Sequence, residues 1–280
     1  MNSKYKTIKY KKNKLSKADD LISVEEPLEM IVQYKENNEW IDNSISITMR
    51  TPGNDENLVV GLLFNEGVIS DFSEISKIEL MGEKVGQYNL QNKIRVTLSD
   101  AKNLDIKHLK RNFLTNSSCG VCGKTSIDSI EVTCKKKINP SKPQIKTSVI
   151  TKVPNILRQE QSEFSKTGGI HASALFNKEG KPLVIKEDVG RHNALDKLIG
   201  YALKKKLLDN KSQFLACSGR LNFDLVQKAL IANIGVLIGV GAPTSLAVDL
   251  ANKFDMTLVG FVKEGSFNIY SNKERIILNI

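Results

Sequence analysis

Two cysteines separated by two residues, Cys119 and Cys122, are the side chains of this sequence best suited to chemistry. They lie in the segment Ser-Ser-Cys-Gly-Val-Cys-Gly (117–123), whose glycines and serines offer little bulk that would bury a thiol. A reachable thiol ionises more readily than a buried one, and its thiolate is a nucleophile and a metal ligand. The pair therefore predicts sulfur chemistry or a metal site.

Three kinds of chemistry were weighed for this pair. A structural zinc site needs four ligands; the only other cysteines are Cys134 and Cys217, so we expect no metal. Cys217 ends a predicted buried strand and is expected in the core. The pair fits a disulfide switch, and it fits equally a sulfur carrier that holds sulfur as a persulfide on one thiolate. Residue types alone do not decide between these two.

The composition is typical of a soluble globular protein, with 40% hydrophobic and 26% charged residues in 280. No apolar run is long enough to span a membrane, and no secretory signal is recognisable, so we expect a cytoplasmic protein. The net charge is +10, and residues 1–20 contribute seven lysines before the first acid, Asp19. We expect this leader to be solvated and disordered, and we expect no nucleic-acid partner because no recognition motif accompanies it.

Residues 21–134 predict an α+β domain that carries the cysteine segment. Its expected elements are strands over 28–34, 45–50, 76–81 and 88–98, a helix capped by Asn54 or Asp55 and closed by Gly67, and a helix over 102–113. Residues 135–152 are polar, with three successive lysines and two prolines, and predict a linker.

Residues 153–280 predict an α/β domain. After a helix from Pro154 to about Lys166, two apolar runs (170–176 and 182–186) indicate a hairpin, and Asp188 is a candidate cap for the next helix. Strands and helices then alternate, which is typical of a parallel sheet with right-handed crossovers: strands 213–217, 236–240 and 257–262, and helices 222–233 and 245–254.

Ligands of parallel sheets bind at the carboxyl ends of the strands. The segments expected there contain Gly219 and Arg220, then Thr244 and Ser245, then Lys263. Glycine lets a ligand approach the backbone, free helix N–H groups favour anions, and the two cations add positive charge. The segments predict a site for a phosphate-bearing ligand; the alternative is that they are ordinary turns.

A second polar cluster precedes the helix that follows residue 188. Arg191 and His192 fall in its first turn, where the helix dipole disfavours cations, and this placement suggests function. The alternative is a capped helix in which Arg191 pairs with Glu187. His171, on a predicted strand, is expected to be packed or hydrogen-bonded and not a ligand.

Several short segments of the sequence form a recognisable set. They are Thr-Pro (51–52), Gly-Leu-Leu-Phe-Asn-Glu-Gly (61–67), Ser-Cys-Gly-Val-Cys-Gly (118–123), Thr-Gly-Gly-Ile-His-Ala (167–172), Glu-Asp-Val-Gly-Arg-His-Asn-Ala-Leu-Asp-Lys (187–197), Ser-Gly-Arg (218–220), Ala-Pro-Thr-Ser-Leu-Ala (242–247) and Gly-Phe-Val (260–262). Together they resemble one family, the formate dehydrogenase accessory sulfurtransferases (FdhD). The segments cover most of the chain beyond the leader.

The resemblance implies a cytoplasmic sulfurtransferase that takes sulfur from a cysteine desulfurase. The acceptor is the molybdenum cofactor, bis-molybdopterin guanine dinucleotide, before its insertion into formate dehydrogenase; it is a substrate, and no tightly bound cofactor is expected. The persulfide cysteine maps onto Cys119 and the second thiol onto Cys122. The cofactor-binding stretch maps onto Phe261, Val262, Lys263, Glu264, Gly265 and Ser266, although an arginine is common where this chain has Ser266. We also expect a homodimer.

The family's second half is similar to the cytidine deaminase fold, which implies a three-layer α/β domain. Deaminases bind zinc through His-x-Glu and Pro-Cys-x-x-Cys motifs. The matching places here read His192-Asn193-Ala194 and Cys217-Ser218-Gly219-Arg220, so the glutamate and one cysteine are missing. We expect neither zinc nor deamination. A thiol–disulfide redox protein and a nucleotide-binding chaperone without catalysis remain the alternatives.

Overall fold

The computed structural model describes residues 1–99, 138, 142–209 and 211–278. Cys119, Cys122 and the helix predicted over 102–113 lie outside the described residues. Within the described part, no helix is both long enough and apolar enough to cross a membrane.

The N-terminal unit is a four-stranded sheet with the order β4-β3-β6-β5. Strand β3 (Glu26–Glu36) pairs antiparallel with β4 (Glu39–Arg50) and parallel with β6 (Lys93–Leu98), and β5 (Ile75–Met81) follows the short helix η1 (Phe72–Glu74). Alternate β3 residues are buried against helix α1 (Asp55–Asn65) because the side-chain period of a strand is two. The strands predicted over 28–34, 45–50 and 76–81 and the helix after Asn54 are confirmed, whereas the strand predicted over 88–98 begins only at Lys93, and Asn54 is the N-cap residue without a side-chain capping bond.

The C-terminal unit is a six-stranded mixed sheet with the order β13-β12-β11-β10-β8-β9. As predicted, its centre is parallel: β10 (Gln213–Cys217), β11 (Val236–Gly239) and β12 (Thr257–Lys263). The predicted hairpin is β8 (His171–Asn177) with β9 (Pro182–Asp188), and β8 pairs antiparallel with β10. The sequence reading missed β13 (Ser266–Ser271), which pairs antiparallel with β12.

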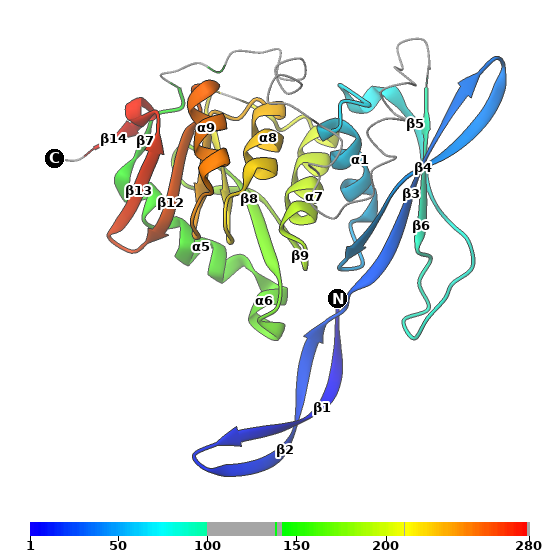
Figure 1. The fold of residues 1–280 in the computed structure, drawn as a ribbon, viewed down its shortest axis with the longest axis horizontal. Helices are drawn as coiled ribbons and strands as arrows, with labels where there is room; N and C mark the ends of the chain where they lie inside the picture. Colours follow the sequence, from blue (N-terminus) through cyan, green and yellow to red (C-terminus); the bar gives the residue numbers. More distant parts are fainter. Residues whose placement is uncertain (100–137, 139–141, 210, 279–280) are drawn as a thin grey trace.

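Helices cover both faces of this sheet, so the unit has three layers (Figure 1). One face packs against α7 (Arg191–Lys204), α8 (Phe223–Ile231) and α9 (Ser245–Lys253). The other packs against α4 (Thr147–Ile150) and α5 (Val153–Glu160), with α6 (Ser162–Thr167) following. The predicted α/β fold class is confirmed.

The linker predicted over 135–152 is wrong for its described C-terminal part. Strand β7 (Ile145–Lys146) pairs with β14 (Ile276–Ile277), just after the short helix η2 (Lys273–Arg275). Ile145 and Ile150 are fully buried in the core on the α5 face. The polar composition of the segment hides these two buried isoleucines from sequence analysis. Because both pack in the core of the C-terminal unit, the described residues 142–152 belong to that unit.

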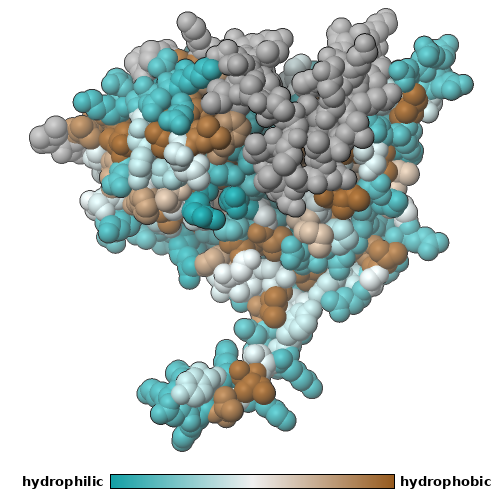
Figure 2. Space-filling model, in the orientation of Figure 1, coloured by the Kyte–Doolittle hydropathy of each residue, from teal (hydrophilic) through white to brown (hydrophobic). Residues whose placement is uncertain are grey.

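The disordered leader is also a wrong prediction. Strands β1 (Asn2–Lys11) and β2 (Lys14–Ser23) pair over ten residues and project as a ribbon away from both units (Figure 1). Lys12 and Asn13 have positive φ, which is the geometry of a tight hairpin turn. The base is held by the N-terminal amine, 3.2 Å from the Glu163 carboxylate. Figure 2 shows hydrophilic and hydrophobic side chains side by side on this hairpin.

The two units meet where α1 crosses α7. A Cβ atom on Gly61 would lie 1.9 Å from the Asp196 carbonyl oxygen, and one on Gly200 would lie 2.0 Å from the Asn57 carbonyl oxygen. The helix backbones therefore touch at two glycines that no other residue can replace without a shift. Phe64 and Leu203 pack at this seam, and each contacts the apolar core of the other unit.

Candidate functional site

The segments that follow the three parallel strands are joined to one another through their backbones. The Gly241 N–H donates to the Gly219 carbonyl at 3.1 Å, and the Phe261 N–H donates to the Gly241 carbonyl at 3.1 Å. The structure thus brings the sequence-predicted segments 218–220, 241–245 and 261–266 side by side, and we call them the strand-end edge. Its continuity follows from the parallel order of β10, β11 and β12.

Glycines let these segments lie close together. A Cβ on Gly241 would stand 2.9 Å from the Arg220 backbone nitrogen, and one on Gly260 would stand 2.8 Å from the Pro243 ring. Packing alone therefore explains these glycines, whether or not a ligand binds. A Cβ on Gly219 would have the His171 ring of β8 as its nearest neighbour, at 3.3 Å.

Side chains that can meet a ligand are exposed along the strand-end edge. Arg220, Thr244, Ser245 and Lys263 are exposed, and neither cation forms an ion pair with another described residue. Thr244 stands at the N-cap of α9 without a side-chain capping bond, so its hydroxyl and the first N–H groups of α9 are available to a ligand. This arrangement suits an anion.

The stretch from residue 261 to 266 divides into exposed and buried parts. Phe261 has φ of 53°, a left-handed conformation rare for a bulky residue, and its side chain is 51% exposed. Val262 is only 2% exposed and belongs to the core, so it anchors the turn and does not face a ligand. Beyond it, Lys263, Glu264, Gly265 and Ser266 are all exposed. The strained backbone thus presents an aromatic ring to solvent.

The start of α7 lies at the same edge of the sheet, because β9 runs antiparallel to β8 and ends there. Asp188 does not cap α7 through its side chain, and Gly190 is the N-cap residue. The Asp188 carboxylate is fully buried, pairs with Lys197 at 2.6 Å, and accepts a hydrogen bond from the Thr51 N–H at 3.1 Å. The predicted cap is therefore wrong; Asp188 instead joins the two units.

Among the described residues, Arg191 has no acidic partner, although the alternative of an ordinary capped helix predicts an ion pair with Glu187. Glu187 accepts hydrogen bonds from the Glu163 and Phe164 N–H groups at 3.1 and 2.9 Å, at the beginning of α6. The Nε of Arg191 is buried and makes no hydrogen bond in the structure. Arg191 is therefore a buried donor at the edge where an anion is expected.

His192 is held by α8. Its Nε2 lies 3.0 Å from the Asn222 amide nitrogen and 3.5 Å from an Asp224 carboxylate oxygen. Burial lowers the pKa of His192 below its usual value, and the nearby cations Lys228 and Arg191 lower it further. Burial likewise raises the pKa of Asp224. His192 is thus a mainly neutral imidazole near neutral pH, positioned by its contacts with α8.

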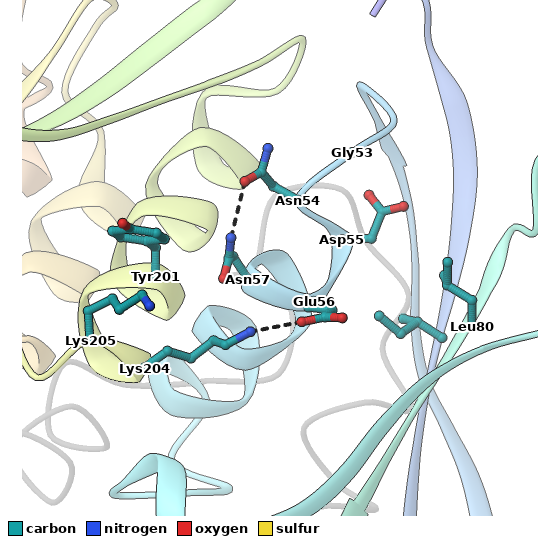
Figure 3. A pocket seen from close by; sticks show the side chains of 10 residues that line it. Gly53, Asn54, Asp55, Glu56, Asn57, Leu80, Tyr201, Lys204 and Lys205 are labelled. Carbon is teal, nitrogen blue, oxygen red and sulfur yellow. Dashed lines mark hydrogen bonds and ion pairs between the residues drawn. The ribbon is translucent and has the colours of Figure 1, made fainter.

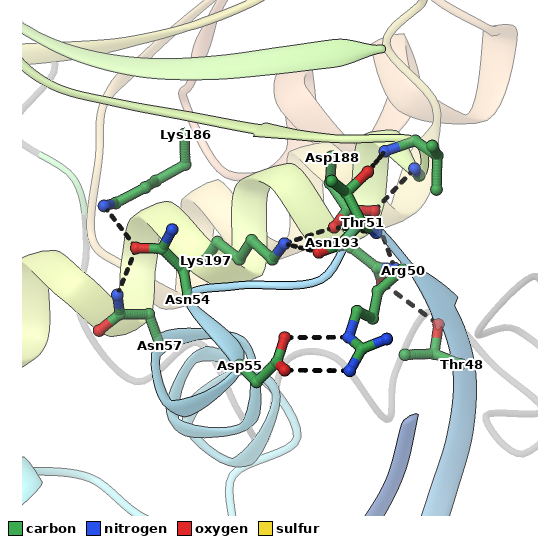
Figure 4. Close-up of polar contacts among 12 residues, drawn as sticks. Thr48, Arg50, Thr51, Asn54, Asp55, Asn57, Lys186, Asp188, Asn193 and Lys197 are labelled. Atoms are coloured by element: carbon green, nitrogen blue, oxygen red, sulfur yellow. Dashed lines mark hydrogen bonds and ion pairs between the residues drawn. The ribbon is translucent and has the colours of Figure 1, made fainter. Parts of the chain in front are cut away.

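A buried polar network fixes α7 relative to the N-terminal unit (Figure 4). Lys197 donates to the Thr51 carbonyl at 2.7 Å in addition to its ion pair with Asp188. Arg50 forms a two-point pair with Asp55, with both N···O distances at 3.0 Å. Because Asp188 and Arg191 are three residues apart, this network also determines the position of Arg191.

Cys217 is buried and belongs to the core, as predicted. Burial raises the pKa of its thiol to about 11, so it stays protonated at neutral pH and is not a nucleophile. Its closest polar neighbour is the Ser173 hydroxyl at 3.6 Å. Among the described residues, no group of three or more potential ligands is placed to hold a metal ion.

A cavity of about 420 Å³ lies elsewhere, near the seam between the units (Figure 3). It is lined by Gly53, Asn54, Asp55, Glu56, Asn57, Leu80, Ile94, Tyr201, Lys204 and Lys205. Lys204 pairs with Glu56 at 2.8 Å, and Asp55 pairs with Arg50. Much of the charge on the residues that line the cavity is therefore already neutralised. The cavity contains none of the sequence-predicted site residues and adjoins the opposite end of α7 from Arg191.

Comparison with known proteins extends over nearly the whole chain. The "Sulfur carrier protein FdhD" of Streptomyces avermitilis is 41% identical over 275 residues, which are 98% of this chain and 95% of that protein. The protein of the same name from Sulfurisphaera tokodaii is 38% identical over 260 residues, 92% of each chain. A crystal structure assigned to a formate dehydrogenase accessory protein from Desulfotalea psychrophila has a TM-score of 0.72 at 23% identity, covers 99% of both chains, and confirms the fold. The model of the FdhD/NarQ family matches residues 23–277, and the chain therefore belongs to this family.

Proposed function

We propose that this protein is a sulfur carrier that serves formate dehydrogenase. Sulfur arrives from a cysteine desulfurase: the Cys119 thiolate attacks the outer sulfur of the donor persulfide, the donor S–S bond breaks, and the donor cysteine leaves as a thiolate. The Cys122 thiolate then attacks the Cys119 sulfur of the persulfide, so that the S–S bond breaks, the outer sulfur leaves as sulfide to the molybdenum cofactor before insertion into the dehydrogenase, and a Cys119–Cys122 disulfide remains for a thiol reductant to reopen. The main support is the match with curated sulfur carriers, which extends over residues 23–277 and so spans the segment that holds the cysteine pair.

The strand-end edge is the proposed binding place of the acceptor, whose phosphates and guanines need cations and a stacking surface. Lys263 and Arg220 are placed to contact phosphates, together with the free N–H groups at the start of α9. The exposed Phe261 ring is suited to stack on a guanine. The contacts within the edge are made by the backbone, so these side chains remain available to a ligand.

The first test is direct detection of the carried sulfur. After incubation with a cysteine desulfurase and cysteine, the protein is desalted and treated with cyanide, which releases a persulfide sulfur as thiocyanate. We expect close to one thiocyanate per chain. A thiol–disulfide redox protein or a nucleotide-binding chaperone releases none, so an absence of thiocyanate contradicts the carrier proposal and favours these alternatives.

The second test concerns the acceptor site. Lys263→Glu places a negative charge where a phosphate is expected, so we expect GDP to bind more weakly by about 1–3 kcal/mol. Calorimetry with GDP measures this change. Lys181→Glu is the matched control: it makes the same charge change on an exposed residue in the β8–β9 turn, at the opposite edge of the sheet. Equal GDP affinity in wild type and Lys263→Glu removes Lys263 from the site.

A further inference from the structure

His171 is a polar residue at the strand-end edge that the proposed function does not use. It is the first residue of β8 and pairs in register with Asp188 on β9. The side chain is partly buried beside Gly219 and makes no hydrogen bond to any other residue in the described part of the chain. Of the two expectations for this ring, packed or hydrogen-bonded, the described residues bear out the packing and show no hydrogen bond.

Charged groups from two elements act on this ring. Burial lowers the pKa of His171 most, the Arg191 guanidinium of α7 lowers it further, and the Asp188 carboxylate of β9 raises it. Asp188 is already paired with Lys197, so its charge is largely neutralised by that lysine. Groups of α8, namely Asn222, Asp224 and Lys228, act on His192 and not on His171. The Arg191 cation thus has the largest effect of any charged group on the His171 ring, and the carboxylate that opposes it, Asp188, is already paired.

We propose that His171 and Arg191 form a phosphate subsite of their own, in which His171 binds the phosphate as an imidazolium. Two observations on geometry carry this: the Arg191 Nε is buried without a hydrogen-bond partner among the described residues, and His171, whose ring also makes no hydrogen bond there, pairs in register with Asp188, three residues before Arg191. Each is a donor left unsatisfied at one place in the edge, and a phosphate oxygen would satisfy both.

This subsite is separate from the one around Lys263. In the sheet, β8 and β12 are separated by β10 and β11, and strands lie about 4.8 Å apart, so the two places are roughly 14 Å from each other. A ligand with two nucleotide arms, each with its own pyrophosphate, would occupy both. The occupation of both subsites by one two-armed ligand rests on the proposed function, whereas phosphate binding at His171 does not.

Phosphate binding at this subsite must be linked to protonation. Without a ligand the His171 pKa is below its usual value, so the ring is mainly neutral at pH 7. A bound phosphate favours the imidazolium and raises that pKa. Between the two pKa values, binding takes up a proton, and the affinity falls as the pH rises through the pKa of the bound state.

The experiment is a proton NMR titration of the imidazole resonances with and without inorganic pyrophosphate. The chain has only three histidines, and His171→Gln identifies the resonance of His171. We expect pyrophosphate to raise the pKa of His171 and Arg191→Gln to weaken pyrophosphate binding at pH 6 by about tenfold or more. Lys181→Glu, at the opposite edge, is expected to leave both measurements unchanged.

The possible results separate this inference from the proposed function. A His171 pKa that pyrophosphate leaves unchanged contradicts the subsite, as does a response equally lost in Lys263→Glu, which would mean one subsite and not two. A protein that shows the His171 response but releases no thiocyanate after desulfurase treatment keeps the phosphate subsite and loses the sulfur carrier. A protein that releases thiocyanate but shows no His171 response keeps the sulfur carrier and loses the phosphate subsite.

Discussion

The Cys119→Ala protein is expected to give no formate dehydrogenase activity in a strain that lacks its own copy of the carrier. The persulfide needs a thiolate that the donor can reach, and alanine cannot form one. Cys122→Ala is expected to have an equal or smaller effect, because the proposed function gives the second thiol only an assisting role. Dehydrogenase activity in cell extracts, together with the thiocyanate assay on the purified variants, measures both effects.

Cys217→Ala is the matched control for this experiment. It removes a thiol of the same kind, but one that is buried and whose pKa is raised to about 11, so it takes no part in sulfur transfer. We expect the Cys217→Ala protein to support full dehydrogenase activity. Full activity from the Cys119→Ala protein would contradict the persulfide mechanism.

The Gly200→Ala protein is expected to lose most of its stability or to fail to fold. Helix propensity alone favours alanine over glycine by about 1 kcal/mol in a helix interior. Here the added methyl would stand 2.0 Å from the Asn57 carbonyl oxygen and 2.7 Å from the Gly61 nitrogen, both backbone atoms. Relief requires α1 and α7 to move apart, which we expect to cost more than about 4 kcal/mol.

Chemical denaturation of soluble protein measures the free energy of unfolding, and the soluble yield covers the case of complete misfolding. Gly169→Ala is the control, since its methyl would meet nothing closer than a carbonyl oxygen at 3.9 Å. We expect that change to stay within about 0.5 kcal/mol of wild type. A Gly200→Ala protein as stable as wild type would mean that the helix backbones do not touch in solution.

Apolar periodicity and turn residues in the sequence predicted those strands and helices whose burial pattern is continuous along the chain. The apolar runs of β10, β11 and β12 and the helices between them were found because each buries one continuous face. The cysteine pair could be named from its spacing, but its chemistry could not, since a switch and a carrier use the same residues. Family resemblance, and not spacing, favoured the carrier.

Long-range contacts explain what the sequence reading missed. Asp188 has the position of a helix cap, yet Thr51, which is 137 residues away, and Lys197 determine its role. His171 had the pattern of a packed strand residue, because only the pairing of β8 with β9 brings it close to Arg191. The β1–β2 hairpin was missed because its lysines outweighed the strand pattern of the residues between them.

The glycine seam between α1 and α7 has a consequence for how sulfur travels. Many proteins built from two units carry a group between sites by opening and closing a hinge. Here the helix backbones touch at Gly61 and Gly200, and opening would expose the apolar side chains of Phe64 and Leu203. The two units therefore act as one rigid frame. For the proposed sulfur carrier, this means that the sulfur donor and the cofactor must each reach the same frame, because bending between the two units does not bring them together.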